Sequence, residues 1–405
     1  MSAEKESVAA GAAVVERTHD LSRGQVGWSL AAHFASSLSI GIAVGGMVPL
    51  ISLTLENRDV GSVLIGVNSA MTSLGVIAAA PWVPTIIRRL GATEGIVLGL
   101  MLTSLSVLLL AFTDSLPTWL FLRFLIGVGV VTQWVVSETW MQAIVSERRR
   151  GLVMSGYVTS IASGFAMGPV ILTLTGTEGV LPFAVFAIMT AATALPMLPI
   201  RRWVPVLALG QRGSIRRLLR EAPTIAAAAL AVGLVDSSFF TFIPLYGVRI
   251  GMPEEAAVTL LTVVLAGNVL LQVPLGWLAD RVPRRLLLVV LAVLCSVGPG
   301  VSGWLLAVGS IWAYPSLFVW GGAAFGLYTV AVTMLGERYR GGELAAANAA
   351  FVMTFELANM LGPPAAGSAM DAWQPYGLMV WMTAVAVIFT ALAIARGLKP
   401  RTDRT

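Results

Sequence analysis

The sequence has little charge for its length. Of its 405 residues, 12% are charged and 57% are hydrophobic, whereas a typical soluble protein has roughly 25% charged residues. So few charged side chains cannot cover the surface of a water-soluble fold of this size. The composition therefore excludes an intrinsically disordered chain and an ordinary soluble enzyme. It predicts that lipid surrounds most of the protein.

Residues that support covalent, metal or nucleotide chemistry are also scarce. The single cysteine, Cys295, has no partner for a disulfide within the chain. Two histidines and one cysteine do not supply a usual zinc ligand set. The only lysines are Lys5 and Lys399, so the phosphate-binding loop G-x-x-x-x-G-K-[ST] is absent. We therefore expect no metal, no bound cofactor and no ATP hydrolysis through such a loop.

Long apolar stretches follow one another along the chain. About 20 apolar residues suffice to cross a bilayer, and backbone polar groups in lipid must be paired within helices. Twelve spans are predicted, at 28–55, 60–83, 95–113, 117–144, 152–175, 180–200, 224–249, 257–279, 286–307, 311–335, 343–367 and 376–396. The sequence therefore predicts an all-α integral membrane protein with twelve transmembrane helices.

Basic residues gather on one side of these spans. Of the 26 lysines and arginines, 23 lie in the two tails and in the loops that follow even-numbered spans. Arg58 and Arg249 lie on the opposite side, and Arg123 lies within a span. The positive-inside rule then places the tails 1–27 and 397–405 in the cytoplasm. We expect a multi-pass protein of a bacterial-type inner (plasma) membrane. Its basic residues are expected to determine the orientation of the spans and not to bind nucleic acid.

Short sequence matches indicate two related halves. Residues 147–151, 168–169 and 81–88 match 337–341, 362–363 and 274–281, with offsets of 190, 194 and 193. We predict a six-helix bundle at 28–200, a cytoplasmic linker at 201–223 and a second six-helix bundle at 224–396. Parallel halves of this kind are a transporter architecture with the substrate site between them.

The linker contains a short amphipathic pattern. Ile215, Leu218 and Leu219 share one helical face, and arginines surround it. The pattern fits a helix on the anionic membrane surface and, equally well, a plain basic linker.

The loop after the eighth span carries a signature. Residues 276–285 read GWLADRVPRR. This closely resembles the loop G-x-L-a-D-r-x-x-r-r of the major facilitator superfamily. The resemblance extends from about residue 25 to residue 398. It implies two pseudo-symmetric bundles that rock about a central cavity, and a transporter with no covalent chemistry and no cofactor.

The same resemblance implies a cytoplasmic gate. Gly276 would let a neighbouring helix approach closely, and Asp280 would accept hydrogen bonds from the start of the fifth span near Gly151. The first-half copy has Val83 and Ile87 at the two matching positions. The loop could instead be solvated and serve only topology. The gate candidates are Gly276, Asp280, Arg281, Arg284, Arg285, Arg88, Arg89 and Glu138.

Three further patterns lie in the fourth and fifth spans. Residues 123–129, RFLIGVG, are similar to the R-x-x-x-G-x-G pattern that accompanies proton coupling in drug/proton exchangers of the superfamily. Residues 134–140, WVVSETW, are similar to the YcaD-like branch of bacterial members. The exporter-like pattern G-x-x-x-G-P, which also serves ordinary helix packing, lacks its following glycines here. It comprises Gly164, Gly168 and Pro169, with Gly362 and Pro363 in the second half.

Charges within the spans are candidate functional residues, because an ionisable group in a bilayer costs about 2.5–3.5 kcal/mol on insertion scales. Asp236 and Glu356 lie near the middle of the seventh and eleventh spans. Either could take a proton on one side and release it on the other, or be paired structurally. The full set of proton-coupling or substrate candidates is Asp236, Glu356, Arg123, Asn359, Asn348, Asn268, Gln272, Trp134 and His33.

The leading hypothesis is an alternating-access antiporter that exports a small amphipathic or hydrophobic compound against protons. Few polar residues lie along spans 1, 7 and 10, which favours such a cargo over a polar one. An uptake symporter for a sugar or organic acid is the alternative. A membrane-embedded enzyme and a non-transporting sensor are rivals of other classes. Expected partners are a small-molecule substrate, protons and membrane lipids.

Overall fold

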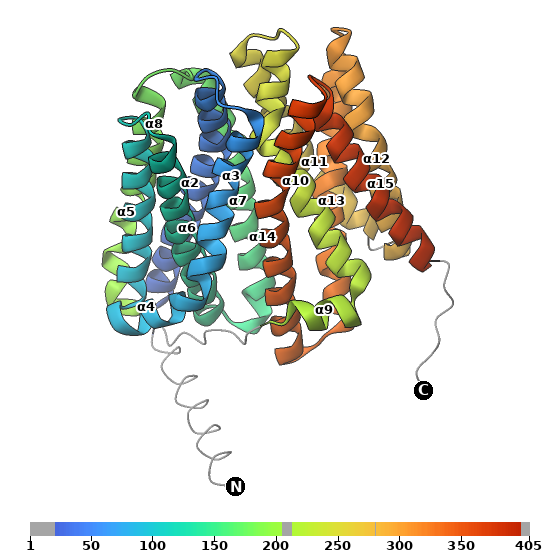
Figure 1. Ribbon diagram of the computed structural model, residues 1–405. Coiled ribbons are helices and arrows are strands. Elements are labelled where there is room, and N and C mark those ends of the chain that lie inside the picture. Colours follow the sequence, from blue (N-terminus) through green and yellow to red (C-terminus); the bar gives the residue numbers. More distant parts are fainter. Residues whose placement is uncertain (1–20, 205–212, 280, 398–405) are drawn as a thin grey trace.

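The computed structural model describes residues 21–204, 213–279 and 281–397, and these residues form helices without any strand (Figure 1). The α-helices are α2 (Arg23–Glu56), α3 (Ser62–Ala79), α4 (Val83–Leu90), α5 (Ala92–Leu110), α6 (Leu116–Ile144), α7 (Glu147–Thr175), α8 (Leu181–Ala192), α9 (Ile215–Glu221), α10 (Pro223–Arg249), α11 (Glu254–Ala279), α12 (Arg284–Ala307), α13 (Ala313–Arg338), α14 (Gly341–Ala372) and α15 (Gly377–Gly397). Short 3-10 helices cover Ala80–Trp82, Leu195–Met197 and Pro199–Trp203.

Each predicted span coincides with a helix or with a helix continued by a 3-10 turn. Ten of them are long and apolar enough to cross a membrane. The apolar helix Leu181–Met197 is shorter, and α14 is less apolar because it carries Asn348, Glu356 and Asn359. The predicted all-α membrane fold is confirmed.

The second span differs from its prediction at one end. The sequence predicts a loop after residue 83, whereas the chain continues through a 3-10 turn into α4, which ends at Leu90. Pro81 and Pro84 lack the N–H that an uninterrupted helix needs, so the helix is broken locally and then resumes. As a result Arg88 and Arg89 occupy the last helical turn, where cations interact favourably with the helix dipole.

Within each half, glycine residues allow pairs of helices to pack closely. A Cβ at Gly164 of α7 would lie 2.2 Å from the carbonyl oxygen of Leu38 in α2. In the second half, a Cβ at Gly362 of α14 would lie 2.6 Å from the carbonyl oxygen of Leu234 in α10. These contacts show that the G-x-x-x-G-P pattern mediates packing of α7 on α2.

We call the end of the molecule that contains residues 56–62 and 249–254 the outer end, and the opposite end, with α4 and α9, the inner end; they lie at the top and bottom of Figure 1. At the outer end, α3 of the first half packs closely on α14 of the second. A Cβ at Gly66 would lie 2.3 Å from the carbonyl oxygen of Pro363, and one at Gly367 would lie 2.3 Å from that of Ser62. Backbone contact between the halves therefore closes this end.

Candidate functional site

Asp236 and Glu356 come together in the structure. They lie on the packed helices α10 and α14, are half-buried, and interact electrostatically with one another. The side chains of Asn359 and of Ser73 lie near the Glu356 carboxyl group and interact with it. Because Ser73 belongs to α3, the carboxyl pair lies where the two halves of the chain meet.

Tyr328 of α13 lies among three intramembrane carboxyl groups. It is within electrostatic range of Glu138, Asp236 and Glu356. Its ring packs edge-on against Phe351 and Phe355 of α14, at centroid distances of 5.3 and 5.4 Å. We call Glu138, Asp236, Glu356 and Tyr328 the acid cluster. Sequence reasoning missed Tyr328, although a phenol in the middle of an apolar span was an available signal.

Glu138 joins this cluster from the first half. Its carboxylate accepts a hydrogen bond of 3.2 Å from the Gln142 amide, and the Trp134 side chain lies near it. Trp134 is 38% exposed, so the indole borders open space. The sequence assigns Glu138 to the gate and Trp134 to the substrate region; the structure places both beside the same cluster.

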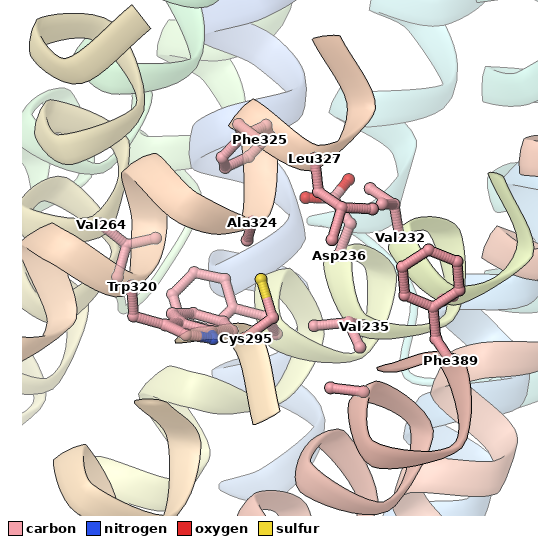
Figure 2. Close-up of a pocket in the computed structure, with 13 residues that line it drawn as sticks. Val232, Val235, Asp236, Val264, Cys295, Trp320, Ala324, Phe325, Leu327 and Phe389 are labelled. Carbon is pink, nitrogen blue, oxygen red and sulfur yellow. The ribbon is translucent and has the colours of Figure 1, made fainter. Parts of the chain in front are cut away.

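A small cavity of about 30 Å³ lies in the second half next to Asp236 (Figure 2). Asp236 is the only charged residue in its lining, which also includes Trp320, Cys295 and Phe389. Figure 2 shows Asp236 near Leu327 on one side and Trp320 near Cys295 on the other. This volume is enough for a water molecule. An apolar lining with one acid suits an apolar group that carries a single polar function.

The other polar candidates fall into separate groups. The buried ring of His33 contacts the Ser137 hydroxyl at 3.1 Å through Nδ1, within the first half. In the second half, the Gln272 amide donates to Asn268 at 2.8 Å and accepts from the Thr329 hydroxyl at 3.1 Å. Asn348 is exposed. The structure therefore does not bring these residues into one site.

Arg123 is buried beside α3 and has few partners. Its Nε donates to the backbone carbonyl of Asn68 at 3.4 Å. Within the described residues, no carboxylate lies within 4.0 Å of its guanidinium. Gly127 makes this placement possible, because a Cβ there would lie 2.0 Å from the Thr72 carbonyl oxygen.

The predicted gate is only partly visible. Asp280 lies outside the described residues. Arg281 stacks on the Trp277 ring at 3.6 Å, and Arg284 pairs with Glu337 of the same half. Among the described residues, a Cβ at Gly276 would meet nothing within 4 Å; the expected neighbour near Gly151 lies outside the part of the chain whose side chains are described. Arg88, Arg89 and Arg285 are exposed.

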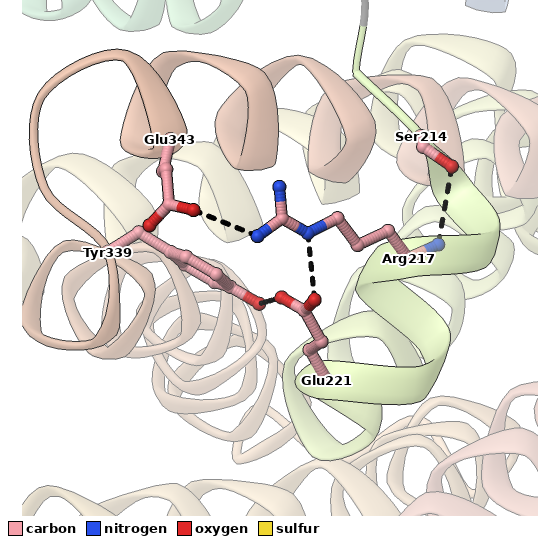
Figure 3. A network of polar contacts seen from close by, with 5 residues as sticks. All are labelled: Ser214, Arg217, Glu221, Tyr339 and Glu343. Atoms are coloured by element: carbon pink, nitrogen blue, oxygen red, sulfur yellow. Dashed lines mark hydrogen bonds and ion pairs between the residues drawn. The ribbon is translucent and has the colours of Figure 1, made fainter.

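The linker helix α9 docks on the second half at the inner end (Figure 3). Arg217 binds Glu221 at 2.7 Å and Glu343 of α14 at 2.9 Å, and the Tyr339 hydroxyl donates to Glu221 at 3.0 Å. Arg217 holds the pKa of the Glu221 carboxyl below its usual value, and Tyr339 acts in the same direction. Of the predicted apolar face, Leu218 packs on protein with 2% exposure, while Leu219 remains 45% exposed.

Ionic contacts between the halves occupy the outer end, and sequence reasoning assigned them no role. Arg249 binds Glu56 through two hydrogen bonds, of 2.7 and 2.8 Å, and also donates to Ser62 at 3.0 Å. Glu254 accepts from Asn57 at 3.1 Å and from Thr177. Arg249 is one of only two basic residues expected on this side, which was the available signal. Among the described residues, no salt bridge joins the two halves at the inner end.

Comparison with known proteins identifies the family. The model of the Major Facilitator Superfamily matches residues 30–335 and 260–405. The chain is 25% identical to the MFS-type transporter YfkF of Bacillus subtilis over 370 residues, covering 88% of this chain and 92% of the relative. It is 25% identical to the MFS-type transporter YcaD of Shigella flexneri over 361 residues, covering 88% and 93%.

Solved structures with the same fold include three transporters. A bacterial homolog of the human lysosomal transporter Spinster, captured inward-facing, has a TM-score of 0.73 at 14% identity, covering 93% of this chain and 96% of that one. The D-xylose–proton symporter has a TM-score of 0.72 at 15% identity, covering 92% and 97%. The nucleoside transporter NupG has a TM-score of 0.70 at 13% identity, covering 92% and 96%.

The chain belongs to the Major Facilitator Superfamily, among relatives of the YcaD-like branch, and is a membrane transporter and not an enzyme.

Proposed function

We propose that this transporter moves a small amphipathic compound by alternating access, with export in exchange for protons as the expected direction. The acid cluster is the proposed proton site. The observation that carries the proposal is the meeting of Asp236 and Glu356 with Glu138 around Tyr328, because carboxyl groups inside a membrane protein commonly form proton relays.

The position of the cluster supports coupling to movement. Glu356 in the second half contacts Ser73 in the first, and Tyr328 of the second half faces Glu138 of the first. Rocking of one half against the other would break and remake these contacts. The affinity of the carboxyl groups for protons would then differ between the two access states, as coupled transport requires.

The apolar surroundings of Asp236 favour an amphipathic cargo. The lining of the water-sized cavity beside it is apolar apart from that one acid, so this region offers few hydrogen-bond partners to a sugar. The two halves, 28–200 and 224–396, are proposed to move as units, with both tails in the cytoplasm and the outer end facing the periplasm or the exterior.

Proton flux in proteoliposomes that contain a pH-sensitive dye tests the proposal. Lipophilic cations, organic acids and sugars are added in turn to the wild type and to the Asp236→Asn, Glu356→Gln double variant. We expect at least one compound to move protons only in the wild type. Compound-driven proton movement of equal size in the double variant would remove these two acids from the mechanism.

Proton-coupled uptake of an organic acid is a second candidate, because Arg123 is a buried cation with no carboxylate partner among the described residues. The same assay separates the two directions. In export by exchange, protons move opposite to the compound, and in uptake by symport they move with it.

A further inference from the structure

We infer that Arg123, Asn68 and Thr72 form a binding site for an anionic group, on the face of α3 that packs against α6. The inference deepens the proposed function, since it gives a negative charge to the cargo or to an ion that accompanies it. Arg123 is 3% exposed and Asn68 is fully buried. The site therefore lies inside the protein and not on its lipid-facing or aqueous surface.

The hydrogen-bonding groups of this site lack partners. Among the described residues, neither Nδ2 nor Oδ1 of Asn68 has a hydrogen-bond partner, and neither does the Thr72 hydroxyl, although all three atoms are buried. The guanidinium of Arg123 has five N–H donors, and the described residues supply one acceptor, at 3.4 Å. Buried polar groups in proteins are almost always hydrogen-bonded, so three neighbouring exceptions indicate a missing ligand.

The chemistry of these groups selects an anion. A buried cation is costly unless it is paired, and here the carboxylate that usually neutralises an arginine is absent within the described residues. Asn68 and Thr72 are one helical turn apart on α3, so their donors lie on the same face. A cation with two neutral donors suits a carboxylate or a halide. Oδ1 of Asn68 can accept from a water molecule that accompanies the anion.

The site is adjacent to the acid cluster but distinct from it. The residue after Asn68, Ser69, hydrogen bonds to Thr241 of α10 at 2.8 Å, and Ser73 follows Thr72 and contacts Glu356. One face of α3 thus carries the anion site and the adjoining face contacts the second half. An anion that moves α3 relative to α6 would also move Ser69 and Ser73.

Thermal unfolding of the full-length protein in detergent tests the inference. Tryptophan fluorescence is followed while sodium chloride or sodium benzoate replaces sodium gluconate at constant ionic strength. We expect a saturable rise in Tm for the wild type that Arg123→Gln abolishes. Thr72→Val should raise the half-maximal anion concentration about tenfold, because it removes one hydrogen bond to a charged group. Arg58→Gln is the matched control, since Arg58 already pairs with Asp114 at 2.9 Å.

The relative responses identify the source of the anion. A response to chloride that benzoate does not exceed assigns the site to an inorganic ion. A response to benzoate at lower concentration assigns it to the head group of an amphipathic acid. No saturable response, or an equal one in Arg123→Gln, would overturn the inference.

A second variant keeps the test decisive if Arg123→Gln does not fold. Asn68→Asp supplies the missing carboxylate from within the protein, so it should raise Tm without added anion and abolish the anion response. A lower Tm with an intact anion response would contradict the inference. Proton flux is measured on the same preparations, so that this test stays separate from that of the proposed function. If flux depends on Asp236 and Glu356 but no anion response is found, only the anion site is refuted and the proposed function stands.

Discussion

At the residue scale, two glycines that look alike in the sequence have opposite surroundings. A Cβ at Gly164 would lie 2.2 Å from a backbone oxygen, whereas one at Gly276 would meet no described residue within 4 Å. We therefore predict that Gly164→Ala destabilises the protein by roughly 1–3 kcal/mol, since backbone atoms must move apart. Gly276→Ala should leave stability unchanged. Thermal unfolding in detergent measures both, and an equal loss at the two positions would contradict the packing described for α7 on α2.

Tyr328 allows a second prediction at the same scale. Tyr328→Phe keeps the ring that packs on Phe351 and Phe355 and removes only the hydroxyl, which interacts electrostatically with the three acids. We expect unchanged thermal stability and a displaced pH dependence of transport, measured as initial flux across a pH series. A loss of stability with an unaltered pH profile would show that Tyr328 has a packing role alone.

At the element scale, α9 is held by charged contacts that can be removed singly. Arg217→Gln should loosen α9 from α14, because it removes the bond to Glu343 and, within α9, the bond to Glu221. Hydrogen exchange over residues 215–221 should then increase. Arg216→Gln, on the same helix and equally exposed, is the control. Unaltered exchange in Arg217→Gln would show that apolar contacts of Leu218 suffice.

The same helix should respond to acid. The pKa of Glu221 is lowered from 4.5 in the docked state, so its ionised form stabilises docking. This contribution is complete above the ordinary value and is lost as the pH falls through the lowered one. Exchange over 215–221 should therefore rise only at pH below about 4.5, and the rise should be smaller in Glu221→Gln.

At the scale of the whole molecule, the halves are joined at the outer end, where Glu56 and Arg249 form a bidentate ion pair. Arg249→Gln removes charge-assisted hydrogen bonds worth about 1.5–3 kcal/mol, which is roughly tenfold or more in the population of the outer-closed state. A cysteine introduced as Ser69→Cys in a Cys295→Ala background should then react faster with an impermeant maleimide added at the outer side.

The control for that experiment lies at the same end. Arg58 pairs with Asp114 within the first half, so Arg58→Gln removes a positive charge without touching the contact between halves. Equal labelling of Ser69→Cys in both variants would show that surface charge, and not the Glu56–Arg249 pair, determines access.

The sequence by itself determined the membrane character of the chain, the positions of its helices and its family. Each of these properties depends on a contiguous stretch of sequence. Each apolar span is stabilised in the membrane by its own burial, and the family signature occupies the contiguous residues 276–285. The continuation of the second span into α4 was not predicted, although Pro81 and Pro84, which lack N–H groups, explain the local break. The intramembrane charges Asp236, Glu356 and Arg123 were recognisable for the same reason, since burial of each carries its own cost.

Only the tertiary structure decided which of these charges meet. Asp236 and Glu356 interact electrostatically with Tyr328. Arg123 instead contacts the backbone of Asn68, and the side chains of Asn68 and Thr72 lack hydrogen-bond partners among the described residues. Glu56 and Arg249 are 193 residues apart and still form a bidentate pair. Such pairings depend on the rotation and contact of whole helices, which glycines such as Gly66 and Gly127 set through close backbone approach. Hydropathy places a residue at a depth in the membrane, and helix packing determines its neighbours.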